Sequence, residues 1–121
     1  MARQPAYAEL YLAPFYDKYG HDTVLALLDP EELRRVFTYD PKRGRLLWDG
    51  YPLLLGEIVT STGRVSRIGG AHAYAISVGR VTLPEAFFIW MYHDGRLPVS
   101  HIYFLDRHMT NARIENMEDG N

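Results

Sequence analysis

The chain has 121 residues, of which 47% are hydrophobic, 13% aromatic and 23% charged, a composition that predicts one globular domain with a buried core and excludes disordered, collagen-like and coiled-coil classes. It contains no cysteine, which excludes disulfides, iron–sulfur clusters, thiolate zinc sites and cysteine nucleophiles. No secretory signal opens the chain and no apolar run reaches the about 18 residues of a membrane span, so we expect a cytoplasmic protein without a membrane partner.

Charge is distributed unevenly along the chain, whose formal net charge is -2. The segment from Lys42 to Arg80 has six basic and two acidic residues, a net +4, while the remainder has seven basic and 13 acidic residues, a net −6. Two interpretations are open: the segment contacts nucleic acid through its cations, or these charges only solvate turns and a loop. The cations concerned are Lys42, Arg43, Arg45, Arg64 and Arg67.

Residues 1–38 have helical patterns. Four apolar residues follow the i, i+3, i+4, i+8 spacing of one helix face, although Pro14 would kink or restart that helix, and Gly20 ends it. These four are Tyr7, Leu10, Tyr11 and Phe15. Further on, Asp29 precedes a proline and two glutamates, which predicts an N-cap and a helix from about Pro30 to Val36.

Two hairpins are predicted in the centre of the chain. The segment Tyr39–Gly44 has turn chemistry between two apolar stretches, and Gly79-Arg80 separates two alternating runs around Tyr74–Val78 and Val81–Leu83. Between the hairpins, residues 49–70 carry a weak signal that fits either a surface loop or short strands.

The C-terminal third begins with the strongest core signal. Pro84 opens a helix that is apolar nearly all round and that Gly95 ends, so we expect this helix at the centre of the core. A short strand at Ile102–Leu105 and a short helix at Asn111–Met117 follow, and the whole pattern predicts an α+β fold. The aromatic residues expected to be mostly buried are Trp48, Phe88 and Trp90.

Four segments occur in an order that resembles a known family: "LRRVFTYDPKRGRLLW", "YAISVGRVTL", "FFIWMYHDGRLP" and "FLDRHMTNARIENME". Over roughly Leu33 to Glu118 the chain resembles the phage-type HNH endonucleases, which are ββα-metal or His-Me finger nucleases. The resemblance implies an HNH-like domain of hairpins and a buried central helix at residues 31–121. Residues 1–30 have no counterpart in the family motifs, and we expect them to form an N-terminal helical extension packed on that domain.

The catalytic positions of the family are replaced in this chain. An HNH nuclease needs a histidine that activates water and ligands that hold one divalent ion. The resemblance places the family's Asp-His pair on Tyr103 and Phe104 and a glycine of the site on Arg107, and it leaves only Asn116 among the metal ligands. Phe104 either joins a binding surface or turns inward and fills the vacated pocket. The vestigial site positions are Tyr103, Phe104, Asp106, Arg107, Asn111 and Asn116.

We therefore expect a catalytically inactive HNH-like protein with no catalytic residue, no metal and no cofactor. A relocated metal site is the alternative, in which His108 would act together with Asp106 and Asn116. His101 cannot replace Phe104, because residues three apart on a strand point to opposite faces. For each histidine, including His93 and His72, the other interpretation is a surface or hydrogen-bonded side chain without chemistry.

The functional hypothesis is a non-catalytic binding protein of phage or mobile-element origin, which inhibits or modulates a protein or protein–nucleic-acid complex in the host cytoplasm, as anti-defence or anti-CRISPR inhibitors do. The alternatives are a non-catalytic DNA- or RNA-binding protein, an active metal-dependent nuclease with a relocated site, and a structural subunit. The expected binding surface consists of Lys42, Arg43, Arg45, Arg64, Arg67, Tyr103 and Arg107.

Overall fold

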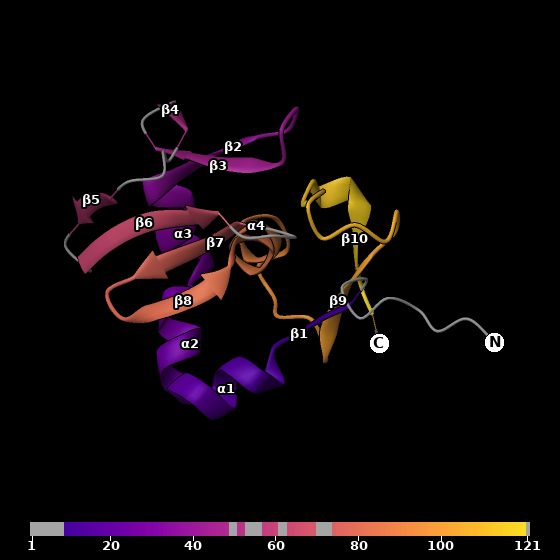
Figure 1. Cartoon of the computed structure of the whole chain (residues 1–121), viewed down its shortest axis with the longest axis horizontal. Coiled ribbons are helices and arrows are strands. Elements are labelled where there is room, and N and C mark those ends of the chain that lie inside the picture. Colours follow the sequence, from indigo (N-terminus) through magenta and orange to yellow (C-terminus); the bar gives the residue numbers. More distant parts are fainter. Residues whose placement is uncertain (1–8, 49–50, 53–56, 61–62, 70–73, 121) are drawn as a thin grey trace.

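The computed structural model describes residues 9–48, 51–52, 57–60, 63–69 and 74–120, with side chains over 9–47, 69 and 74–120. It has an α+β fold, as predicted, in which small antiparallel sheets and short helices surround the helix α4 (Figure 1). The helices are α1 (Ala13–Tyr19), α2 (His21–Leu27), α3 (Pro30–Val36), α4 (Glu85–Asp94) and the 3-10 turn η2 (Ile114–Asn116). The strands are β1 (Glu9–Tyr11), β2 (Phe37–Asp40), β3 (Arg45–Trp48), β4 (Tyr51–Pro52), β5 (Glu57–Thr60), β6 (Gly63–Gly69), β7 (Tyr74–Val78), β8 (Val81–Pro84), β9 (His101–Phe104) and β10 (Met117–Asp119).

The predicted first helix is wrong at its N-terminal part. Residues Glu9–Tyr11 form β1, which pairs antiparallel with β9, and the helix begins only at Ala13 with Pro14 in its first turn. Pairing with a distant strand overrides the helical spacing here, and a proline without an N–H fits a helix best in the first turn. Tyr7 lies outside the described residues.

The next helix and the first hairpin are confirmed. The Asp29 carboxylate accepts a hydrogen bond from the Glu31 backbone N–H at 3.1 Å, so Asp29 caps α3 as predicted. Strands β2 and β3 then pair antiparallel across the turn that ends at Gly44, whose φ of 64° is a left-handed conformation. The division of the chain at residue 30 stays a prediction.

The second hairpin belongs to a four-stranded sheet with the order β5-β6-β7-β8. Strands β7 and β8 pair across Gly79-Arg80, which confirms the predicted hairpin. In the region of weak signal, Glu57–Thr60 and Gly63–Gly69 are strands, so the short-strand interpretation holds for these residues.

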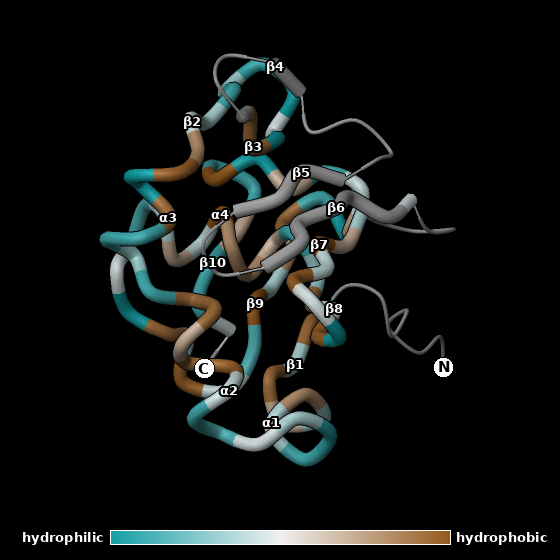
Figure 2. The backbone as a smooth tube through the Cα atoms, turned by 90° about the vertical axis from the view of Figure 1, so that its left-hand side faces the viewer, coloured by the Kyte–Doolittle hydropathy of each residue, from teal (hydrophilic) through white to brown (hydrophobic). Residues whose placement is uncertain are grey.

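The core is centred on α4, a mostly hydrophobic helix that the other elements surround (Figure 2). Phe88 and Trp90 are 1% and 8% exposed, as expected for buried aromatics, and the Trp90 indole N–H donates to the Arg96 carbonyl at 2.8 Å. Gly95, at φ 78°, ends the helix in the predicted way. The side chain of Trp48 lies outside the described residues.

The C-terminal region forms a three-stranded sheet with the order β1-β9-β10. The predicted helix at Asn111–Met117 is wrong except for one 3-10 turn, because Met117–Asp119 extend and pair with β9. Among the described residues, no helix combines the length and the apolar character needed to cross a membrane.

Candidate functional site

Strand β9 places Tyr103 and Phe104, to which the resemblance assigns the family's Asp-His pair, on opposite sides of a sheet. Ile102 and Phe104 are fully buried, whereas His101 and Tyr103 are half-buried on the outer side. Phe104 lies directly across from the buried Met117 of β10. Its side chain has therefore turned inward, which is one of the two alternatives that the sequence left open.

The space next to Phe104 is too small for a substrate. A cavity of about 10 Å³ lies between the first hairpin, the start of α4 and the C-terminal loop, which is room for one water molecule at most. Its lining includes Arg45, Tyr74, Glu85, Phe104 and Thr110. A phosphodiester cannot enter this cavity.

Three residues of the loop after β9 form a closed hydrogen-bond cluster, which we call the Asp106 cluster: Asp106, Asn111 and Asn116. One Asp106 carboxylate oxygen accepts from the Asn116 amide at 2.9 Å and from the His108 backbone N–H at 2.8 Å, and the other accepts from the Asn111 amide at 2.9 Å. The Asn116 side chain in turn accepts from the Asp106 backbone N–H at 3.0 Å and donates to the Asn111 carbonyl at 2.8 Å. Asn116 thus uses both its oxygen and its amide N–H groups to shape the loop.

Electrostatics of the Asp106 cluster favour the ionised carboxylate. Desolvation alone would raise the pKa of Asp106, but hydrogen bonds from Asn111 and Asn116 and from the His108 backbone outweigh it, so the pKa lies below its ordinary value of 3.8. Within the described ranges, no three His, Asp or Glu side chains come together as a metal site.

Two of the histidines considered for a relocated site have different surroundings. His108 is exposed; its backbone N–H donates to the Asp106 carboxylate, and its side chain makes a smaller electrostatic contribution that also lowers the pKa of Asp106. His93 follows the core helix and packs edge-on against Tyr39 at 4.4 Å between ring centroids; desolvation, with help from Arg34, lowers its pKa. His72 lies outside the described residues.

Arg107 has the only left-handed backbone of a residue other than glycine in the described part of the chain, with φ 65°. The resemblance places a glycine of the family here, and the backbone at Arg107 has the conformation that glycine adopts without strain. The side chain is exposed, and the backbone N–H donates to the Phe104 carbonyl at 3.0 Å. A turn of this kind reverses the chain directly after β9.

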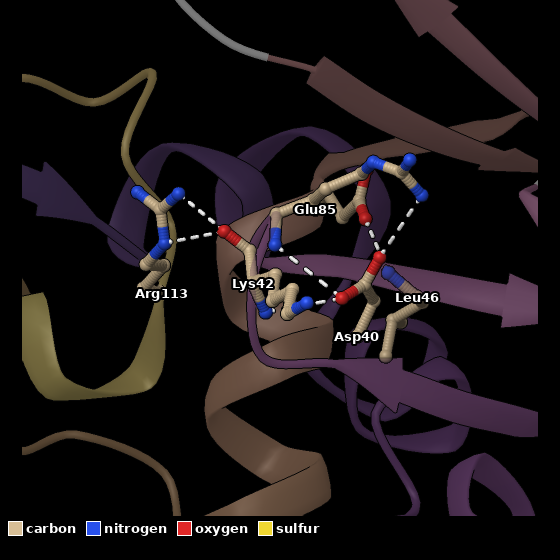
Figure 3. A network of polar contacts seen from close by, with 6 residues as sticks. Asp40, Lys42, Leu46, Glu85 and Arg113 are labelled. Carbon is tan, nitrogen blue, oxygen red and sulfur yellow. Dashed lines mark hydrogen bonds and ion pairs between the residues drawn. The ribbon is translucent and has the colours of Figure 1, made fainter.

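The basic hairpin, Lys42 to Arg45, is held firmly by residues from two other elements (Figure 3). The Arg113 guanidinium donates to the Lys42 carbonyl, with Nε at 2.8 Å, and the buried Glu85 accepts from the Leu46 backbone N–H at 2.9 Å. A Cβ at Gly44 would lie 2.7 Å from the Arg113 backbone nitrogen, so the turn and the C-terminal loop are in close contact.

Only part of the expected cationic surface is brought together. Lys42 and Arg43 are exposed at the hairpin tip, where Arg43 pairs with Asp40 at 3.3 Å, and Arg45 lies over the Tyr74 ring at 4.0 Å. The side chains of Arg64 and Arg67, on β6, lie outside the description. Tyr103 and Arg107 belong instead to β9 and the turn after it.

Two features were missed by reasoning from the sequence. One is Glu85, which is 2% exposed and orients β3; a charged residue at the start of an almost entirely apolar helix was the available signal. The other is the row formed by Glu9, Tyr103 and Glu118 across three strands. The residue pattern within each segment does not reveal how the three strands align with one another, so the sequence held no signal for this row.

No protein-family model matches the chain, and neither a curated protein nor a solved structure does. The resemblance to HNH nucleases therefore stays a prediction from the motifs.

Proposed function

We propose that the chain is a non-catalytic binding protein on an inactivated HNH-type scaffold, which inhibits or modulates a host protein in the manner of phage anti-defence or anti-CRISPR inhibitors. The observation that carries this proposal is the complete burial of Phe104. At the position where the resemblance calls for a general base, the side chain has no ionisable group and no solvent-exposed surface.

The surroundings of Phe104 also support the absence of hydrolysis. A general base must reach the water that it activates, and the neighbouring cavity of about 10 Å³ has no room for a phosphate group. Asn116, the one ligand position that the resemblance retains, has its side chain engaged in the Asp106 cluster. Unlike phosphodiester hydrolysis, a binding function needs neither a general base nor a metal ion.

The rigidity of the C-terminal loop supports a role in binding. Arg113 joins the loop to the basic hairpin, and the Tyr39 hydroxyl accepts from the Ile114 backbone N–H at 3.0 Å. A surface that is already ordered loses less conformational entropy when a partner docks on it. The loop and its neighbouring sheet therefore provide a preorganised surface.

Nucleic-acid binding is the second candidate, because Lys42 and Arg43 are exposed beside the Arg45–Tyr74 pair. Cations next to an aromatic ring are typical of contacts to phosphates and bases. The surrounding surface does not extend this patch, because Glu9, Glu118 and Asp119 carry negative charge on the sheet beyond the C-terminal loop. Protein binding is therefore the preferred function.

The test begins with the tagged full chain as bait in a nuclease-treated bacterial lysate, followed by purification of the captured protein. We expect stoichiometric capture of one protein and a change in that protein's activity when the chain is added. In parallel, the chain should leave plasmid DNA intact with magnesium, manganese or zinc.

Two results would overturn the proposal. Metal-dependent nicking that His108→Ala abolishes would establish the relocated nuclease site. Binding of a labelled duplex that falls steeply between about 50 and 200 mM salt and that Lys42→Ala/Arg43→Ala abolishes, without capture of a protein, would establish the nucleic-acid function.

A further inference from the structure

The outer side of the three-stranded sheet carries an aromatic and acidic surface, which we call the outer sheet face. It consists of Glu9 and Tyr11 on β1, His101 and Tyr103 on β9, and Glu118 on β10. Leu10, Ile102, Phe104 and Met117 point to the other side and are buried in the core. The strand alternation therefore leaves all five residues of this face on the side away from the core.

The register places a tyrosine between two carboxylates. Tyr103 lies directly opposite Glu9 on one neighbouring strand and directly opposite Glu118 on the other. Residues opposite each other in antiparallel strands have Cβ atoms only about 5 Å apart and share a face. The phenol ring is thus flanked on both sides by carboxyl groups.

One half of the outer sheet face is ordered by its own contacts. The Tyr11 hydroxyl donates to the Glu9 carboxylate, His101 Nε2 lies 3.7 Å from the same carboxylate, and the Tyr11 and His101 rings are 4.5 Å apart. His101 Nδ1 is 2.7 Å from the Ser100 hydroxyl. These contacts fix Glu9 beside Tyr103 and leave its carboxylate partly exposed, at 32%.

The other half has no internal partner. In the part of the chain that the structure describes, neither the Tyr103 hydroxyl nor the Glu118 carboxylate makes a side-chain hydrogen bond or ion pair. None of the three strands contains lysine or arginine. The exposed Glu118 carboxylate is therefore available to a group from outside.

We propose that the outer sheet face docks a cationic segment of a partner protein, with an arginine side chain lying over Tyr103 between Glu9 and Glu118. A guanidinium group stacks on an aromatic ring and donates paired hydrogen bonds to carboxylates, so it meets all three side chains at once. Nucleic acid is disfavoured here because its phosphates would face two carboxylates. The inference rests on the proposed protein-binding function and specifies the chemistry of the partner.

The experiment uses the full chain labelled with ¹⁵N and an acetylated, amidated Gly-Arg-Gly-Arg-Gly peptide as the probe. The matched control peptide has citrulline in place of arginine, which keeps the shape and removes the charge. We expect saturable amide shifts on β1, β9 and β10 with the arginine peptide and none with the citrulline peptide. Absence of saturable shifts on these strands would overturn the inference.

Variants separate the roles of the ring and the carboxylate. Tyr103→Ala and Glu118→Gln should each lower the affinity of the chain for the arginine peptide by about tenfold, as loss of an interface anchor does. Glu31→Gln removes another exposed carboxylate, on α3, and should leave the affinity for the peptide unchanged. Glu118 is exposed and glutamine is isosteric with it, so Glu118→Gln should not disturb the fold. This variant therefore tests the inference even if Tyr103→Ala lowers the melting temperature.

The outcome for the captured partner distinguishes this inference from the proposed function. If the bait still captures its partner with Tyr103→Ala and Glu118→Gln, the docking inference is overturned and the binding function stands. If the bait captures no protein, the binding function fails. Self-association of the chain that Glu118→Gln abolishes would identify a second copy, through its basic hairpin, as the occupant and would overturn the inference of a separate partner.

Discussion

The basic hairpin and the outer sheet face have opposite charge, but they differ more in how that charge is used. On the hairpin, Arg43 pairs with Asp40 and Arg45 lies over Tyr74. On the sheet, Glu118 has no ion-pair partner among the described residues. Tyr11 and His101 hold the Glu9 carboxylate in place and leave part of it exposed. Counting charges along the sequence pointed to the hairpin, whereas the contacts point to the sheet. Local charge density is thus a poor guide to which groups are free to bind.

The largest expected effect separates the two sides of β9. Phe104→Ala should lower the free energy of unfolding by ~3 to 5 kcal/mol, because it opens a cavity in a closely packed core. Tyr103→Ala, on the outer side of the same strand, should lower it by less than half as much. Urea denaturation of both variants measures the difference, and equal losses would show that the two sides are not distinct.

A glycine substitution tests how firmly the basic hairpin is held. Gly44→Ala should lower the free energy of unfolding by at least ~2 kcal/mol, because the left-handed backbone disfavours a Cβ and the new methyl group would meet Arg113. Gly79→Ala is the matched control: its φ is 62°, but a Cβ there meets nothing within 4 Å, so only the backbone cost of ~1 kcal/mol remains. Equal melting temperatures of the two variants in thermal denaturation would contradict the close contact between Gly44 and Arg113.

A smaller effect is expected at the turn that follows the outer strand. Arg107→Gly should stabilise the fold by ~0.5 to 1 kcal/mol, because relief of the left-handed strain exceeds the entropy that glycine adds to the unfolded chain. Arg107→Ala keeps the strain and serves as the control for loss of the guanidinium. If glycine and alanine gave the same melting temperature, the turn would not be strained.

The smallest effect concerns acid stability of the Asp106 cluster. The pKa of Asp106 is lowered in the folded chain, so its contribution is present above the ordinary value of 3.8 and is lost as the pH falls through the folded-state pKa. We expect about 0.3 kcal/mol, since the carboxyl is exposed and solvent screens it. Asp106→Asn should flatten the stability profile below pH ~4. A profile with unchanged slope there would contradict the shift.

Local signals predicted much of the fold. Asp29 with Pro30 fixed the start of α3, Gly95 fixed the end of α4, and both hairpins followed from their turn residues. These features depend on hydrogen bonds and dihedral angles within a few residues, which a sequence displays directly.

The errors arise where a segment pairs with another strand instead of following its local pattern. Glu9–Tyr11 has helical spacing yet becomes a strand beside the distant β9. Met117, the last residue of the other predicted helix, becomes the first residue of β10, which also pairs with β9. The outer sheet face combines three such segments, so its register was not available from any one of them. The assignment of Tyr103, Arg107 and the basic residues to one functional surface stays a prediction.

The central position of β9 also constrains how the protein folds. Tyr11 and His101 are register partners although 90 residues separate them in the sequence, and β10 follows β9 by only a short loop. Closing such a long loop is slow compared with forming a local hairpin. During synthesis, β1 leaves the ribosome long before its partner β9. The sheet that carries the outer sheet face therefore forms after the two hairpins. A chain whose synthesis stalls before β9 would contain both hairpins but lack that surface.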